Sequence, residues 1–100
     1  MLVLIPMNSD EVQEAEITKV FDAKIWAQLR IEEGELVEVL HNEKFDGFSN
    51  WSEAVVVCND AEPVMQFMEM SMIVLVAHVQ KTIDDIVEAY LFRELHDIAY

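Results

Sequence analysis

Residues 53–77, EAVVVCNDAEPVMQFMEMSMIVLVA, decide the fold of this chain. Two short apolar runs, 54–58 and 72–77, are separated by a stretch with helical spacing, 61–70. Unbroken apolar runs of this length, rich in β-branched residues, are typical of strands that are covered on both faces. The pattern predicts a strand–helix–strand unit with parallel strands and a right-handed crossover, and hence an α/β fold.

The rest of the chain predicts three more strands and a second helix. Residues 2–5 are a further apolar run, which Pro6 ends, and residues 25–31 and 35–41 alternate around a turn at Gly34, which indicates a β-hairpin. Thr82 precedes a wide apolar stripe of helical spacing. We expect a single domain, residues 1–100, with a mixed five-stranded sheet and helical cover.

Local signals place the boundaries of these elements. Thr82 followed by Asp85 resembles a capping box at the start of the last helix, and His96 is expected at that helix's end. Residues 8–24 and 42–53 are polar and poorly periodic, which predicts two loops, the first with at most one helical turn.

The charge is strongly acidic. Twenty Asp and Glu stand against six Lys and Arg, a net charge of −14, which disfavours nucleic acids and anionic membranes as partners. The charge serves solubility, or it attracts a basic partner protein or a cation. One cysteine forms no internal disulfide, the first ten residues lack a basic signal region, and no apolar run has the length of a membrane span. A cytoplasmic protein is expected.

Candidate ligand residues follow the predicted parallel strands. If these strands are parallel, their carboxyl ends meet at one edge and bring together Asn8, Cys58, Asn59, Asp60 and His78. A thiol, an imidazole and a carboxylate are ligands for zinc or copper, so Cys58 and His78 are the candidate metal residues. The alternatives are that Cys58 is a small buried hydrophobe and that Asn59 and Asp60 cap the following helix.

Two further features bear on function. Asp60 and Glu62 make the turn after residue 58 a poor cradle for an anion, because carboxylates already occupy the positive end of the helix that follows. Phe45, Phe48 and Trp51 recur every third residue in the connector 42–53 and should be covered, either by the sheet or by a second subunit. The sequence shows no nucleophile–base pair and no glycine-rich phosphate loop, so we expect a protein that is not an enzyme.

The chain resembles the dinitrogenase iron-molybdenum cofactor biosynthesis domain, also called nitrogenase accessory factor-like. The resemblance rests on MLVLIPM, on FDAKIWAQLRIEEGELVEVL, on residues 53–77 and on the closing TIDDIVEAYLFREL. It implies an RNase H-like fold in which the first strand is central, with the hairpin on one side and strands 54–58 and 72–77 on the other. The chain departs from the family pattern at the ligand turn, where residues 58–61 hold no glycine, and at the connector 42–53, which is too short for the family's helix.

This resemblance implies a non-catalytic binding or carrier module whose ligand is a metal or a metal–sulfur cluster. The alternative is a protein–protein interaction module without a cofactor, which meets a partner protein or forms a homodimer through its acidic surface or its aromatic connector.

Overall fold

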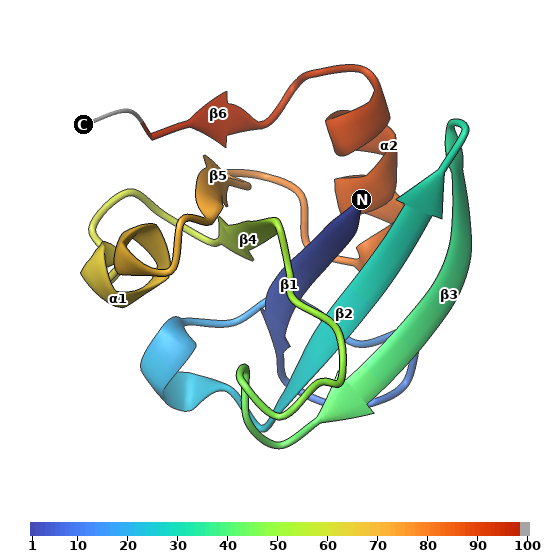
Figure 1. Ribbon diagram of the computed structural model, residues 1–100. Helices are drawn as coiled ribbons and strands as arrows, with labels where there is room; N and C mark the ends of the chain where they lie inside the picture. Colours follow the sequence, from blue (N-terminus) through green and yellow to red (C-terminus); the bar gives the residue numbers. More distant parts are fainter. Residues whose placement is uncertain (99–100) are drawn as a thin grey trace.

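The computed structural model describes residues 1–98 as one mixed six-stranded sheet with a helix on each face (Figure 1). The strands are β1 (Leu2–Met7), β2 (Ile25–Glu32), β3 (Glu35–Asn42), β4 (Ala54–Val57), β5 (Ile73–Val76) and β6 (His96–Asp97). The helices are the short 3-10 helix η1 (Val20–Asp22), α1 (Met65–Glu69) and α2 (Ile83–Leu91). The predicted α/β class is confirmed, with one strand more than the five expected.

The strand order is β3-β2-β1-β4-β5-β6. β1 pairs antiparallel with β2 and parallel with β4, which in turn is parallel to β5, while β6 is antiparallel to β5. The predicted arrangement around a central first strand is therefore confirmed. The predicted hairpin is also present, and its two-residue turn has positive φ at both Glu33 and Gly34.

The sheet separates two apolar layers because alternate residues of each strand point to opposite faces. On one face, Val3, Ile5 and Leu29 pack with Ile83 and Ile86 of α2. On the other face, Leu4, Trp26, Val55 and Val74 of the strands pack beneath the connector and α1, which contributes Phe67. Strands covered on both sides explain why β1 and β4 are unbroken apolar runs.

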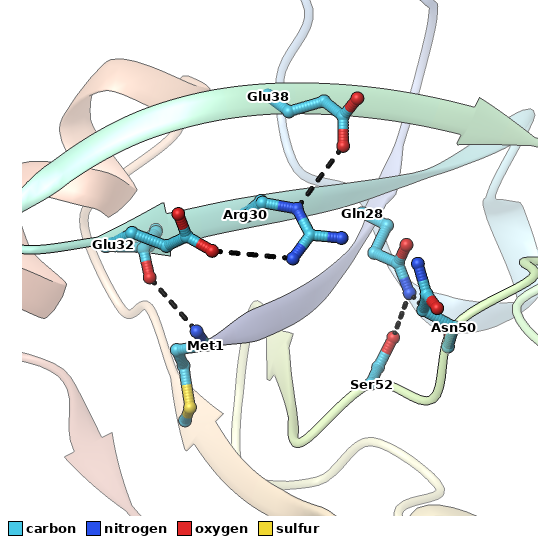
Figure 2. A network of polar contacts seen from close by, with 8 residues as sticks. Met1, Gln28, Arg30, Glu32, Glu38, Asn50 and Ser52 are labelled. Atoms are coloured by element: carbon cyan, nitrogen blue, oxygen red, sulfur yellow. Dashed lines mark hydrogen bonds and ion pairs between the residues drawn. The ribbon is translucent and has the colours of Figure 1, made fainter.

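The connector 42–53 lies across the sheet without a helix, as expected, and buried polar contacts hold it there. The Nε2 amide of Gln28 donates to the carbonyl oxygen of Asn50 at 3.0 Å and to Oγ of Ser52 at 2.7 Å (Figure 2). Gln28 and Ser52 are almost completely buried. At the other end of the connector, Asn42 donates to the carbonyl oxygen of Gly47 and accepts from the backbone N–H of Lys44.

The predicted end of β1 and the predicted extent of α1 were wrong. Pro6 does not end β1, which runs to Met7. Proline has no backbone N–H to donate, but the pairing of β1 with β4 stops at Leu4↔Val55, so this part of the ladder needs no donor at Pro6. The helix predicted over residues 61–70 covers only Met65–Glu69 and is preceded by Val64. Pro63 disfavours a helical conformation at Glu62, so the helix begins after the proline.

The end of α2 was also predicted wrongly. Thr82 caps the helix in a complete capping box with Asp85, as expected. The helix stops at Leu91, however, because Arg93 adopts φ 58° and Glu94 N–H donates back to the carbonyl oxygen of Ala89 at 2.8 Å. His96 therefore lies in β6 and not at a helix end.

Candidate functional site at the carboxyl edge of the parallel strands

The parallel strands β1, β4 and β5 deliver their carboxyl ends to one edge of the sheet, as the sequence predicts. Cys58 follows β4 directly, and Ala77 and His78 follow β5. A hollow of about 290 Å³ opens there. Its lining combines the strand ends with two loops and consists of Ile17, Thr18, Lys19, Asp22, Cys58, Ala77, His78, Gln80 and Lys81.

Backbone contacts join the two loops that form the walls of this hollow. Ile17 N–H donates to the carbonyl oxygen of Lys81 at 2.7 Å, and Thr18 N–H donates to that of Pro6 at 2.9 Å. Lys24 N–H closes the same edge with a bond to the carbonyl oxygen of Met7 at 3.0 Å. The loop residues 17–19 are therefore held against β1 and against the turn that precedes α2.

The structure brings two of the five predicted site residues into this hollow. Cys58 and His78 line it, whereas Asn8 is exposed and uses its Oδ1 to accept the backbone N–H of Glu16 at 2.9 Å. Asn59 lies beside the hollow, where its Nδ2 donates to Cys58 Sγ at 3.5 Å. Asp60 is exposed and is not among the lining residues.

The expected helix-capping role of Asn59 and Asp60 was wrong. Val64 is the residue that precedes α1, and no side chain caps that helix. Asn59 Oδ1 instead accepts the N–H of Ala61 at 2.9 Å, which closes a local turn. With Pro63 setting the helix start further along the chain, the turn after β4 is shaped by Asn59 and not by a helix terminus.

The thiol of Cys58 sits beside a carboxylate. Its Sγ lies 3.9 Å from Oε1 of Glu62, and the same oxygen accepts the backbone N–H of Val20 at 2.7 Å. Burial, and then the negative charge of Glu62, raise the pKa of Cys58 above its ordinary value. The thiol is therefore protonated at neutral pH, which makes it a weak nucleophile and a metal ligand only after proton loss.

Three residues at this edge escaped prediction. Lys19 and Lys81 both line the hollow although they are far apart in sequence, and nothing in the local pattern marks either one. The imidazole of His96 lies with its ring centroid 6.0 Å from that of His78, because β6 pairs His96 with Val76. The sequence offered no signal for this contact beyond the presence of two histidines, because His96 was predicted at the end of a longer helix.

The donor set does not fit a resident metal or metal–sulfur cluster. Among residues 1–98, no three His, Cys, Asp or Glu side chains are grouped as a metal site would require. The single thiol donates its proton to Oε1 of Glu62, and burial together with the negative charge of that carboxylate disfavours its ionisation. Cys58 and His78 both line the hollow, but a zinc or metal–sulfur centre needs more ligands than these two, and within residues 1–98 no third ligand is grouped with them.

Fold and hollow together define a small mixed α/β domain with a ligand-sized recess at the carboxyl edge of its parallel strands. No family model matches the sequence, and no curated protein sequence matches it. Solved structures do share the fold. The crystal structure of "a putative dinitrogenase (mj0327)" from Methanocaldococcus jannaschii superposes with a TM-score of 0.77 and 19% identity, over 99% of this chain and 95% of that one.

A second crystal structure, that of PH0822, superposes with a TM-score of 0.74 and 18% identity, over 98% of this chain and 96% of that one. At these identities the likeness shows a common fold across nearly the whole of each chain. Within the part of the chain that the structure describes, no helix has the length and apolarity to cross a membrane.

Proposed function

We propose that this protein is a non-catalytic binding or carrier module of the nitrogenase accessory factor-like type, and that its ligand enters the hollow at the carboxyl edge. The observation that carries the proposal is the position of this hollow, at the ends of the central parallel strands, where open α/β sheets take their ligands. The fold shared with the M. jannaschii protein supports this proposal.

The charges at the hollow favour a small anion. Lys19 and Lys81, two of the chain's six Lys and Arg residues, line it, whereas Asp22 is the one carboxylate among its lining residues. Glu62 is a second carboxylate close to Cys58, but it is not among the lining residues, and its Oε1 is directed at the N–H of Val20. An anionic metal–sulfur species is therefore proposed as transported cargo held by charge and hydrogen bonds, and not as a centre ligated by Cys58.

The surroundings of Cys58 support a non-catalytic role. Its hydrogen-bond partners are Asn59 and Glu62, and its raised pKa opposes the thiolate that covalent catalysis needs. His78 shares the hollow, but within residues 1–98 no hydrogen bond joins it to the thiol.

Binding of tetrathiomolybdate, a molybdenum–sulfur anion with visible absorption, tests the proposal. We expect Lys81→Ala and Lys19→Ala each to weaken binding about three- to tenfold, and Lys44→Ala, a cation outside the hollow, to leave it unchanged. Cys58→Ser should retain binding, because the cargo is held by charge. Absence of binding at millimolar concentration, or equal losses in Lys81→Ala and Lys44→Ala, would contradict the proposal.

The second candidate function is a protein-interaction module, and one observation favours it. The side chain of Trp51 is 61% exposed although Gln28 holds both neighbouring residues, through the carbonyl oxygen of Asn50 and the hydroxyl of Ser52. Sedimentation over a range of concentrations distinguishes a homodimer, whose apparent mass rises with concentration, from a monomer that awaits a different partner.

A further inference from the structure

A second hollow lies at the opposite ends of the same parallel strands. It measures about 220 Å³ and is lined by Phe45, Asp46, Phe48, Ser49, Asn50, Trp51, Ser52, Met70 and Met72. Ser52 and Met72 shortly precede β4 and β5, so this hollow is at the amino ends of these strands, whereas Cys58 and His78 mark their carboxyl ends. The two hollows are therefore separate sites.

The connector that forms this hollow is anchored to the sheet by buried hydrogen bonds and by ring contacts. Gln28, itself only 2% exposed, reaches from β2 to Asn50 and Ser52, which flank Trp51 (Figure 2). Phe45 packs edge-on against Trp26 and Phe67, with ring centroids 5.6 and 5.1 Å away. A preformed wall lowers the entropy that a partner must lose on binding.

Trp51 is the side chain that this arrangement leaves in water. Phe45 and Phe48 are half-buried and pack on the core below α1, whereas Trp51 is 61% exposed at the rim of the hollow. Of the two alternatives for the connector aromatics, cover by the sheet does not hold for Trp51, and cover by a partner stays a prediction. A large apolar side chain beside a recess, between two residues that are anchored to the sheet, is typical of a contact surface for a partner.

The charges around the hollow decide what kind of partner fits. Asp46 is the only charged side chain among the lining residues, so the recess combines aromatic rings, two methionine thioethers and one carboxylate with no opposing cation. The whole chain carries a net charge of −14, which attracts a basic partner. Tryptophan is the aromatic side chain that binds cations best, and a planar guanidinium both stacks on a ring and pairs with a carboxylate.

We propose that this hollow is the docking site for a basic protein segment, which inserts an arginine side chain between Trp51 and Asp46. This site does not depend on the anion proposed at the carboxyl edge, since it uses different residues at the other ends of β4 and β5. A basic segment would contact the exposed indole of Trp51 and would also be attracted by the acidic charge of the chain.

The test uses an acetylated and amidated peptide, Gly-Arg-Gly-Arg-Gly, titrated into the full chain in 150 mM salt, where long-range attraction is screened. The readout is the NMR signal of the Trp51 indole N–H. We expect saturable shifts of this signal, and we expect the same peptide with citrulline in place of arginine to bind at least about fivefold more weakly, because citrulline is neutral.

Matched variants separate the site from general acidity. Trp51→Ala should weaken binding about fivefold or more and Asp46→Asn about threefold or more, as followed by the backbone amide signals. Phe21→Ala, which removes an aromatic side chain that is 86% exposed elsewhere, and Asp10→Asn, an exposed carboxylate, should change it less than twofold.

Three outcomes would overturn the proposal. The first is equal weakening in Trp51→Ala and Phe21→Ala, and the second is equal binding of the citrulline peptide. The third is self-association of the wild-type chain that Trp51→Ala abolishes, because a second copy would then cover the hollow. A thermal melt of each variant confirms that it is folded, and Trp51 is exposed enough for the alanine variant to keep the fold.

Discussion

The side chain of Gln28 donates a 2.7 Å hydrogen bond to Oγ of Ser52, and both residues are nearly inaccessible to solvent. Gln28 comes from β2, the first strand of the hairpin, and Ser52 from the connector that leads to β4 (Figure 2). This contact fixes a segment that has no regular structure of its own to the face of the sheet, and it fixes the backbone beside Trp51 as well.

Ser52→Ala should lower the free energy of unfolding by about 1–3 kcal/mol, because it leaves a buried amide N–H of Gln28 without that acceptor. Urea denaturation measures the change. Ser49→Ala removes a hydroxyl from an exposed position of the same connector and should cost less than about 0.5 kcal/mol. Equal effects of the two variants would show that the Gln28 contact does not hold the connector.

The connector aromatics should differ sharply in their contribution to stability. Phe45→Ala should cost about 2–4 kcal/mol, since the ring packs between Trp26 and Phe67 and its removal leaves a cavity. Trp51→Ala should change stability by less than about 0.5 kcal/mol, because most of the indole is already in water. Melting of the two variants at one protein concentration compares them, and a larger loss for Trp51→Ala would mean that the indole is buried in solution.

Cys58 should react slowly with a disulfide reagent at pH 8, because its thiol is kept protonated by burial and by Glu62. Glu62→Gln removes that negative charge, retains an oxygen for the N–H of Val20, and should speed the reaction by lowering the pKa of Cys58. Asp60→Asn makes the same change in net charge at an exposed neighbour and should have a smaller effect. Equal rates in both variants would exclude a specific effect of Glu62.

The same thiol makes stability depend on alkaline pH. Because the pKa of Cys58 is raised in the folded state, the unfolded chain loses this proton first as pH rises through the ordinary value of 9.0. The contribution of Cys58 is therefore complete below pH 9.0 and declines above it, up to the folded pKa. Cys58→Ser should remove this part of the decline in denaturation experiments between neutral and alkaline pH.

Arg93→Gly should stabilise the fold by about 0.5–1 kcal/mol. Arg93 has φ 58° in the turn that ends α2, and glycine adopts that conformation without the steric cost that a Cβ imposes. Arg93→Ala is the control, because it removes the charge but keeps the Cβ, and it should bring no gain. Thermal or urea unfolding that ranks the alanine variant above the glycine variant would contradict this account.

The strand and helix types could be predicted because they depend on local patterns. The apolar runs in β1, β4 and β5 gave the parallel strands, and Thr82 with Asp85 gave the start of α2. The errors came from local backbone effects that apolar periodicity does not contain. Pro63 shifted the start of α1 to Met65, and the left-handed conformation of Arg93 ended α2 early, so that His96 lies in β6. Neither glycine nor asparagine marks that turn, so the usual stop signal is missing.

By itself, the sequence determined which segments are continuously apolar and which alternate, and this was enough for the α/β class, the hairpin and the placing of Cys58 and His78 at one edge. The order of the strands around β1 came from the family resemblance. Tertiary structure alone decided what surrounds them. Lys19 and Lys81 line one hollow, and Glu62 raises the pKa of the Cys58 thiol. Gln28 anchors Asn50 and Ser52 on either side of the exposed Trp51. The two lysines and the contacts of Gln28 come together because residues distant in the chain pack against one another. The spacing of apolar residues follows from the local geometry of strands and helices, so it can be seen in the sequence. A site depends on contacts between segments that are distant in sequence, and these contacts form only when the chain folds.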